Sequence, residues 1–188
     1  MSVPTPSPSH GLIDTLTPPV CKVDHLRGTA AARVTVVEFG DYECPHCATA
    51  ERLTRRLLER HPTELAIVFR HLPVVELHPH ALSAALAAEA ASSQGMFWEM
   101  HDFLFANQLK LENSDLIEYA ALAGLDIARF CDDLETRRFE PRVRDCLRSA
   151  SESGADRTPS FFLNGRRHFP LGLASLEKAI DDSIHANR

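Results

Sequence analysis

The feature that most constrains the fold of this chain is a pair of cysteines, three positions apart, between an apolar run and an amphipathic segment. Residues 33–39, RVTVVEF, are β-branched and almost entirely apolar, which predicts a strand covered on both faces. The motif Cys44-Pro45-His46-Cys47 follows this run. A helix is then predicted from about Cys44 to His61, because apolar residues recur along one stripe and a proline follows. The stripe consists of Ala50, Leu53 and Leu57, and the proline is Pro62.

The rest of the chain divides into an all-helical block and a shorter mixed part. LAIVF at 65–69 predicts a second buried strand, and the length of the crossover between the strands favours a parallel pair. From Leu72 to Arg138 strand signals vanish and helical periodicity repeats. A helix over 140–153, a hairpin around Asn164-Gly165 and a terminal helix then follow. The terminal helix should turn four residues inward, namely Leu173, Leu176, Ile180 and Ile184.

This order of elements predicts an α/β chain, a thioredoxin fold with an inserted all-helical domain. The thioredoxin-like domain is expected to comprise residues 23–71 and 140–188, and the helical insertion residues 72–139. Residues 1–22 are rich in Pro, Ser and Thr with little to bury, so we expect a flexible tail and the start of ordered structure near Val23.

Charge and composition exclude some classes of partner. The 188 residues carry 20 Lys and Arg against 26 Asp and Glu, and the basic residues are scattered, so nucleic acid is not expected as a partner. The first residues lack the features of a signal peptide, and no run is long enough to span a bilayer. We therefore expect no membrane segment and a cytoplasmic chain, or a periplasmic or exported one if a leader has been removed.

Two cysteines at this spacing on the first turn of a helix lie on the same side, which suits a reversible disulfide. Cys44 would lie at the helix N-terminus, where free N–H groups and the helix dipole stabilise a thiolate. Cys47, one turn further in, would be shielded. This asymmetry makes Cys44 the attacking thiol and Cys47 the one that resolves a mixed disulfide. His46 adds a hydrogen-bond donor or a positive charge beside the sulfur of Cys44.

The same spacing also occurs in zinc sites. Structural zinc needs a second pair of ligands, and the sequence has no second CxxC and no spaced histidine pair. His78 and His80 flank Pro79, which we interpret as the first residue of a helix rather than as part of a metal site. We therefore expect no metal and no cofactor, and keep zinc as the alternative.

The other three cysteines are not predicted to take part. Cys131 and Cys146 lie on two predicted helices that could form an antiparallel hairpin, so a second disulfide is one interpretation. Neither belongs clearly to a shared apolar stripe, which favours two unrelated thiols. Cys21, beside the tail, is expected to be incidental.

Four segments resemble the bacterial DsbA-like family of thiol-disulfide oxidoreductases, over about residues 23 to 187. They are VEFGDYECPHC, FRHLPVVELHPHALSAALAAEAA, GMFWEMHDFLFANQ and TPSFFLNGRRH. The resemblance implies that Cys44 is the nucleophile, that Cys47 is the resolving cysteine, and that Pro45 and His46 tune the redox potential. Its partners would be protein substrates with cysteines or disulfides, together with a separate redox partner protein.

The resemblance also extends to the segment before the hairpin. It implies that Pro159 is a cis-proline beside the active site and that Thr158 offers backbone hydrogen bonds to the substrate chain. Arg157 departs from the family, whose members generally carry glycine there. A cation at Arg157 would crowd or recharge the substrate groove and could stabilise the Cys44 thiolate; the alternative is an exposed loop arginine.

Glu38 is the one acidic residue in the apolar run before the CPHC motif. A buried carboxylate costs several kcal/mol unless it is paired or protonated. Either Glu38 reaches water at the strand end, or it lies beneath the active-site helix and exchanges a proton with Cys47, as the resemblance implies.

Two hypotheses for function remain at this point. The first is a dithiol-disulfide oxidoreductase, an enzyme that exchanges disulfides with protein cysteines through CPHC. The alternative is a non-catalytic protein-binding module or a zinc-binding protein on the same fold.

Overall fold

A five-stranded mixed sheet forms the centre of the molecule. The computed structural model describes residues 14–169 and 172–186, and the strand order is β1-β3-β2-β4-β5. Its strands are β1 (His25–Gly28), β2 (Val34–Gly40), β3 (Leu65–His71), β4 (Ser160–Leu163) and β5 (Arg166–His168). The predicted parallel pair is formed by β2 and β3, while β1, β4 and β5 each pair antiparallel with a neighbour.

Helices cover both faces of the sheet. Alternate residues of β2 belong to different cores: Val34 and Val36 pack with α1 (Pro45–Arg60) and α7 (Leu173–Ala186), whereas Val37 and Phe39 pack on the side of α6 (Glu140–Glu152). This two-sided burial explains why β2 lacks the alternating pattern of a half-exposed strand. Of the four inward residues predicted in α7, Leu176, Ile180 and Ile184 are fully buried and Leu173 is partly buried.

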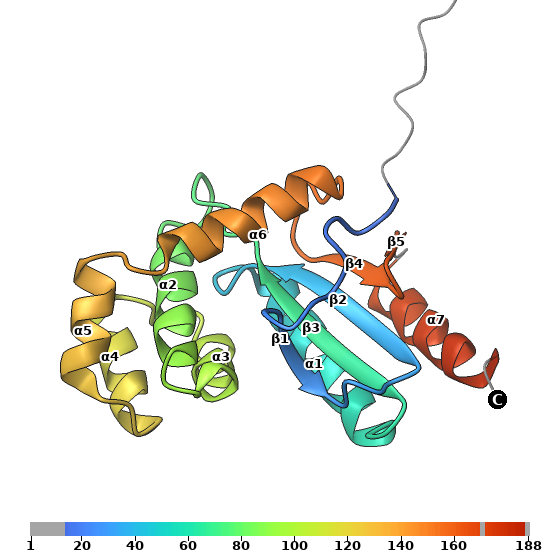
Figure 1. Cartoon of the computed structure of the whole chain (residues 1–188), viewed down its shortest axis with the longest axis horizontal. Helices are drawn as coiled ribbons and strands as arrows, with labels where there is room; N and C mark the ends of the chain where they lie inside the picture. The colour runs from blue at the N-terminus through green and yellow to red at the C-terminus, as the bar shows by residue number, and fades with distance from the viewer. Residues whose placement is uncertain (1–13, 170–171, 187–188) are drawn as a thin grey trace, which may run out of the picture.

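The predicted helical block forms a separate group beside the sheet (Figure 1). It contains α2 (Ala81–Ser92), α3 (Phe97–Ala106), α4 (Asn113–Leu122) and α5 (Ile127–Glu135), and α6 then runs from this group back over the sheet. The core of the helical group continues to the start of α1, where it includes Tyr42, Cys44 and Cys47. The CPHC motif therefore lies where the helical group meets the sheet.

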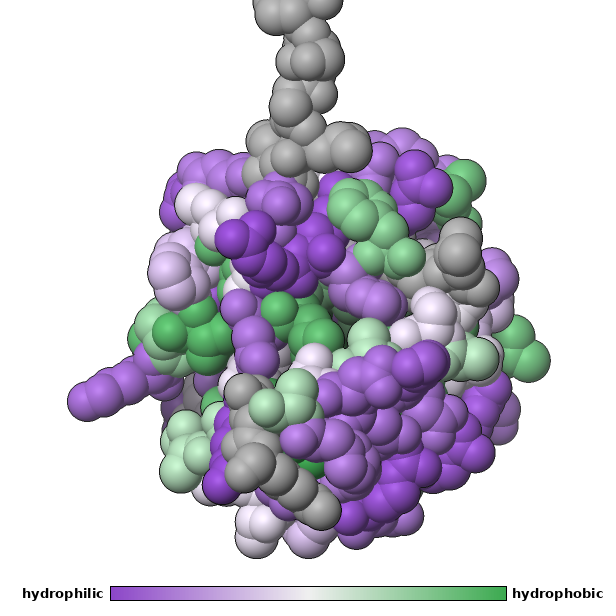
Figure 2. All heavy atoms as spheres, turned by 90° about the vertical axis from the view of Figure 1, so that its right-hand side faces the viewer, coloured by the Kyte–Doolittle hydropathy of each residue, from purple (hydrophilic) through white to green (hydrophobic). Residues whose placement is uncertain are grey.

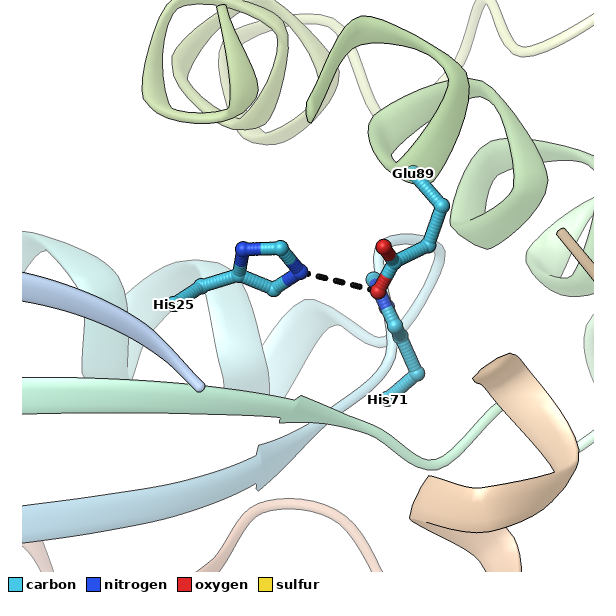
Figure 3. A group of neighbouring side chains, drawn as sticks. All are labelled: His25, His71 and Glu89. Carbon is cyan, nitrogen blue, oxygen red and sulfur yellow. Dashed lines mark hydrogen bonds and ion pairs between the residues drawn. The ribbon is translucent and has the colours of Figure 1, made fainter. Parts of the chain in front are cut away.

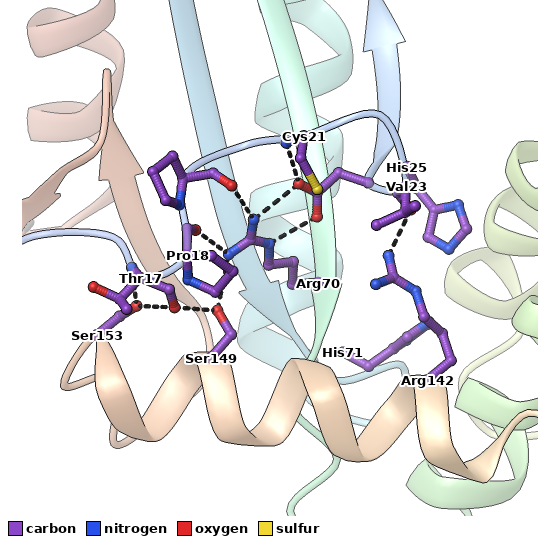
Figure 4. A network of polar contacts seen from close by, with 12 residues as sticks. Thr17, Pro18, Cys21, Val23, His25, Arg70, His71, Arg142, Ser149 and Ser153 are labelled. Carbon is purple, nitrogen blue, oxygen red and sulfur yellow. Dashed lines mark hydrogen bonds and ion pairs between the residues drawn. The ribbon is translucent and has the colours of Figure 1, made fainter.

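The chain enters the fold earlier than its composition indicates. Leu16 is buried, and the N–H of Thr17 donates to Ser153 on α6. Arg70 of β3 donates to the carbonyl groups of Pro18 and Pro19 and forms a fully buried ion pair with Asp24 (Figure 4). The expected start of ordered structure near Val23 is therefore wrong.

The physical reason is that the buried side chain of Arg70 holds the proline-rich segment in place by hydrogen bonds, although this segment has few apolar side chains of its own. An arginine with five donors needs several acceptors when it is buried, and the free carbonyl groups of a proline-rich segment provide them. The remainder of the predicted tail, residues 1–13, lies outside the described residues. β1 follows directly and was not predicted from its sequence HLRG.

Candidate active site

The CPHC motif opens α1 (Pro45–Arg60). Cys44 is the N-cap, with extended backbone angles, and Pro45 occupies the first turn, where its missing N–H leaves no intrahelical hydrogen bond unmade. Pro45 and His46 are exposed, whereas Cys44 and Cys47 are buried, with exposed fractions of 4% and 0%. The turn thus presents the dipeptide to solvent and keeps both sulfur atoms below the surface.

Hydrogen bonds lower the pKa of Cys44 to about 5. The largest contribution is the hydrogen bond from Cys47, which outweighs the opposing effect of burial. Further donors are the side chain of Thr158 and the backbone N–H groups of Cys47 and His46, at the start of the helix. At neutral pH Cys44 is therefore a thiolate, the reactive form of a cysteine.

Cys47 has the opposite chemistry. Burial raises its pKa well above the ordinary value, and its hydrogen bond to Cys44 and the charges of Glu38 and Cys44 raise it further. Cys47 therefore remains a thiol and donates to its neighbour. The two sulfur atoms share one proton on the side of Cys47, which is the arrangement that the spacing predicts for an attacking and a resolving thiol.

The segment before β4 lies against this pair. Ser160 pairs with Phe39 near the end of β2, which places Thr158 and Pro159 beside the turn that follows β2. The Thr158–Pro159 bond is cis, and the sulfur of Cys44 lies 3.7 Å from the carbonyl oxygen of Thr158. Strand pairing thus brings together two motifs that are far apart in the sequence.

Glu38 lies beneath the active-site helix. It is 1% exposed, on the same face of β2 as Val34 and Val36, so the interpretation of Glu38 as a solvated strand-end residue is wrong. Its Oε1 has no hydrogen-bond partner among the described residues. Burial, followed by the charges of Glu51 and Cys44, raises its pKa well above the ordinary value. A carboxyl group with a raised pKa can exchange a proton with the nearby thiol of Cys47: its carboxylate form accepts the proton and its acid form returns it.

A groove of about 570 Å³ opens beside the motif, between α1, the β4–β5 hairpin and the start of α7. His46, Arg157 and Pro159 line it together with Phe161 and Phe169. The side chain of Arg157 is largely exposed and pairs with its neighbour Asp156, so it lies at the rim of the groove. Figure 2 shows that the face carrying β5 and α7 is mostly hydrophilic, with small groups of hydrophobic side chains between the polar ones.

Some polar residues of the site were not predicted from the sequence. The side chain of Gln108, in the loop after α3, donates to the carbonyl groups of Tyr42 at 2.7 Å and Cys44 at 2.9 Å. The carboxylate of Asp41 accepts a hydrogen bond from Nδ1 of His78 at 2.8 Å, whereas the sequence analysis discusses His78 only in connection with a zinc site. No local sequence pattern marks Gln108 as a residue of the site. The contact between Asp41 and His78 could have been anticipated, because acids alternate in GDYEC and histidines alternate in HPH.

Two groups of side chains among the described residues could hold a metal ion, and neither includes a cysteine. One consists of Glu51, His101 and Asp102, and the other of His25, His71 and Glu89, which point toward one another from β1, β3 and α2 (Figure 3).

In the second group, Glu89 Oε1 already lies 2.8 Å from His25 Nε2 and 3.0 Å from His71 Nε2. The guanidinium of Arg142 lies 3.6 Å from the same oxygen and balances its charge. Oε1 of Glu89 is thus satisfied by these donors, whereas Nδ1 of His71 is buried without a hydrogen-bond partner among the described residues, and we derive no metal chemistry from the cluster. Cys131 and Cys146 form no disulfide, and neither do the other three cysteines.

The fold and the paired thiols define a thioredoxin-fold protein with a helical insertion. The family described as Thioredoxin matches residues 21–182, and the chain belongs to this family. It is also similar to solved structures of DsbA-like proteins. BdbD of Bacillus subtilis superimposes with a TM-score of 0.76 at 20% identity, covering 86% of this chain and 93% of that one. A thioredoxin-like oxidoreductase from Silicibacter pomeroyi gives a TM-score of 0.68 at 28% identity, covering 85% and 91%.

Curated relatives are longer than this chain. Na(+)/H(+) antiporter NhaA 3 of Salinispora tropica is 46% identical over 181 residues, which are 96% of this chain and 28% of the antiporter. The chain thus spans little more than a quarter of the length of that relative. Among the described residues, no helix is both long and apolar enough to cross a membrane.

Proposed function

We propose that this protein is a dithiol-disulfide oxidoreductase that exchanges disulfides with protein cysteines through the CPHC motif. The observation that carries the proposal is the opposite perturbation of two adjacent sulfur atoms, a stabilised thiolate at Cys44 and a shielded thiol at Cys47. A purely structural pair would have no need of this asymmetry. Membership of the thioredoxin family supports the same chemistry.

In the reducing direction, the Cys44 thiolate attacks one sulfur of a substrate disulfide. A mixed disulfide forms, the substrate S–S bond breaks, and the other substrate sulfur leaves as a thiolate. Cys47 then loses its proton and attacks Cys44, which releases the second substrate thiolate and leaves Cys44 and Cys47 joined. Two electrons pass from the protein to the substrate, and the reverse sequence oxidises a substrate dithiol.

Glu38 would act in the second step. Cys47 is a poor nucleophile while it holds its proton, because burial raises its pKa. We assign Glu38 as the group that takes this proton, directly or through water that enters with the substrate, and returns it in the reverse direction. Its unpartnered Oε1 is the observation that motivates this role.

The substrate chain would lie in the groove next to the motif. Thr158 and Pro159 precede β4 with their backbone beside Cys44, so an extended peptide could pair with them. Pro45 and His46 form the exposed edge of the motif, where they would tune the potential of the couple. Arg157, at the rim, would favour substrates with an acidic residue near the reactive cysteine.

The proposal predicts selective reactivity of Cys44. At about pH 5, the pKa of this thiol, iodoacetamide should label Cys44 far faster than the other four cysteines. Cys47→Ser should accumulate mixed disulfides with disulfide-bonded protein substrates, because Cys44 attacks the substrate disulfide and no second thiol resolves the product, and Cys44→Ser should form none. Peptide mapping by mass spectrometry identifies each modified cysteine, and even labelling of all five would contradict the assignment.

Activity is tested separately. The wild-type protein should accelerate reduction of insulin by dithiothreitol, and Cys44→Ser should abolish the acceleration. Cys131→Ser is the matched control, because this cysteine lies in the helical group and is predicted to take no part. A wild-type protein that binds substrates without accelerating the reaction would favour a non-catalytic binding module. A measured potential of the Cys44/Cys47 couple then gives the direction of electron flow in a given compartment.

A further inference from the structure

Two acid–histidine pairs join the CPHC turn to the loop between β3 and α2. His78 Nδ1 lies 2.8 Å from Asp41 Oδ2, and His80 Nδ1 lies 2.9 Å from Glu43 Oε1. The acids alternate along the turn as the histidines alternate along the loop. The steps of thiol exchange described above use neither pair.

Asp41 is the fixed point of the first pair. Its side chain is fully buried, its Oδ1 accepts from the N–H of Glu43 at 2.8 Å, and its Oδ2 accepts from the N–H of Val74 at 2.8 Å. The main-chain carbonyl of Asp41 accepts from the N–H of Cys44 at 3.2 Å. Asp41 thus forms hydrogen bonds with both Cys44 and His78. These hydrogen bonds fix the position of His78 relative to Cys44.

The surroundings of His78 favour its charged form. Partial burial alone would lower its pKa, but the hydrogen bond and charge of Asp41, followed by the charges of Cys44 and Glu43, raise it above the ordinary value. The ring is 19% exposed, and its Nε2 has no hydrogen-bond partner within the part of the chain that the structure describes. The charge of Cys44 is not among the main influences on His80, which lies between Glu43 and Glu112.

We propose that His78, held by the buried carboxylate of Asp41, is a positioning residue for thiol exchange, whose imidazolium balances the charge of the Cys44 thiolate in the dithiol form. This inference deepens the proposed function and rests on it. When a substrate disulfide oxidises the pair, Cys44 becomes part of a neutral disulfide, the proton of Cys47 passes to a product thiolate, and His78 loses its anionic neighbour.

Linkage gives this arrangement a measurable consequence. If the thiolate stabilises the imidazolium, the imidazolium stabilises the thiolate by the same free energy. Oxidation removes the thiolate, so the pKa of His78 should fall when the disulfide forms, and the proton affinity of the site then depends on its redox state.

Other ionisable groups lie near the site and also contribute to its electrostatics. They are Glu38 on β2, Glu43 on the turn, His46 and Cys47 on α1, His80 and Glu112 from the helical side, and Asp156 and Arg157 before β4.

The first test is NMR titration of the histidine rings in the full chain, in the dithiol and disulfide forms. The pKa of His78 should be lower in the disulfide form by up to about one unit, near the lower end of the effect of a neighbouring opposite charge. His80 is the internal control and should titrate alike in both forms. Equal pKa values of His78 in the two forms would overturn the inference.

The second test uses matched variants. Asparagine can donate to Asp41 from the position of Nδ1 without carrying a charge, so His78→Asn should keep the loop in place and raise the pKa of Cys44 by about one unit. His80→Asn should leave that pKa unchanged. The pKa is followed by thiolate absorbance and by the rate of alkylation, and a thermal melt confirms that each variant is folded.

These measurements also separate the inference from the proposed function. Thiolate titration and NMR need no protein substrate, so they report on His78 even if the insulin assay fails. Failure of the wild-type protein in that assay would remove the proposed function, whereas an unshifted Cys44 in folded His78→Asn would remove only the role of His78. Equal shifts in His78→Asn and His80→Asn would indicate a general loosening of the loop and would also overturn the inference.

Discussion

Two buried glutamates, Glu38 on β2 and Glu89 on α2, are almost equally buried, with exposed fractions of 1% and 5%. Their pKa values nevertheless shift in opposite directions. Oε1 of Glu38 has no hydrogen-bond partner among the described residues, and burial raises the pKa of this residue. Burial also opposes ionisation of Glu89, but hydrogen bonds from His25 and His71 hold its pKa well below the ordinary value. Burial therefore does not decide the charge of a carboxylate; the donors that face it do.

The comparison contrasts the structural role of Glu89 with the chemical role that we propose for Glu38. Glu89 connects β1, β3 and α6 to α2, because its partners His25, His71 and Arg142 come from those three elements. It thereby joins the helical group to the sheet. Oε1 of Glu38 bonds to no other element among the described residues, and this buried carboxyl group costs free energy where it lies, close to Cys47. Uncompensated cost at a reactive position is characteristic of a functional group.

Removal of Glu89 should produce the largest effect. Glu89→Ala leaves His25, His71 and Arg142 without their common acceptor, so we expect a loss of about 3 to 5 kcal/mol in the free energy of unfolding. Urea unfolding at neutral pH measures this loss. Lys178→Ala, which breaks an exposed ion pair with Asp182, is the control and should cost less than about 1 kcal/mol.

The pH dependence of stability sharpens the same prediction. The folded-state pKa of Glu89 is depressed, so its contribution is complete above the unfolded pKa of about 4.3 and is lost as pH falls toward the folded value. Wild type should therefore lose stability on acidification below that value, and Glu89→Ala should lose less. Parallel pH profiles for the two proteins would show that the ionised carboxylate of Glu89 does not stabilise the fold.

Glu38→Gln should have a smaller effect of the opposite sign. A raised folded-state pKa makes the carboxyl group compatible with folding below the unfolded value of about 4.3 and costly as pH rises above it. The variant should therefore be more stable than wild type at neutral pH by about 1 to 3 kcal/mol, and the gain should vanish in acid. Urea unfolding of the oxidised form at two pH values measures it.

The same substitution tests the proton-transfer role. Glu38→Gln should slow resolution of mixed disulfides near neutral pH in stopped-flow experiments and leave alkylation of Cys44 nearly unchanged. A variant that matches wild type in both stability and resolution rate would mean that Glu38 neither costs free energy nor carries a proton.

The sequence predicted most of what local patterns can encode. The parallel pair of β2 and β3, the helical block, the hairpin at Asn164-Gly165 and the last helix follow from periodicity and turn residues, and all were confirmed. β1 was missed because its sequence, HLRG, is neither apolar nor alternating, and it exists by pairing with β3. Tertiary pairing, not local preference, makes that strand.

The candidate site also contains features that the sequence shows directly and features that depend on contacts between distant segments. CPHC and Thr158-Pro159 are contiguous motifs, so the sequence displays them directly. Glu38 is an acid in an apolar strand, and Glu89 is equally unusual as an acid in an alanine-rich helix, but the sequence analysis predicts a special role only for Glu38. The partners of both acids come from distant segments, and the presence or absence of such partners is what decides the charge of each. Sequence alone therefore identifies candidates but not their ionisation.

Glu51 on α1 is intermediate between the two glutamates. It accepts from His101 Nε2 at 3.1 Å and from Arg55 at 3.0 Å, yet its charge is the second cause, after burial, of the raised pKa of Glu38. Burial lowers the pKa of His101, so its neutral ring can donate to Glu51 and accept from the hydroxyl of Tyr42. Glu51 is thus structurally paired like Glu89 and electrostatically linked to Glu38.

Glu51→Gln should give the smallest and most specific effect. Gln keeps an acceptor for His101, and loss of partly exposed ion pairs to arginine costs only about 0 to 1 kcal/mol. Without the carboxylate charge the pKa of Glu38 should fall, so the pH midpoint of mixed-disulfide resolution should move to lower pH by about half a unit. Asp102→Asn is the matched control, because Asp102 shares Arg27 and Arg55 with Glu51 but does not perturb Glu38. If the pH midpoint does not move in Glu51→Gln, or moves equally in Asp102→Asn, the charge of Glu51 does not specifically raise the pKa of Glu38.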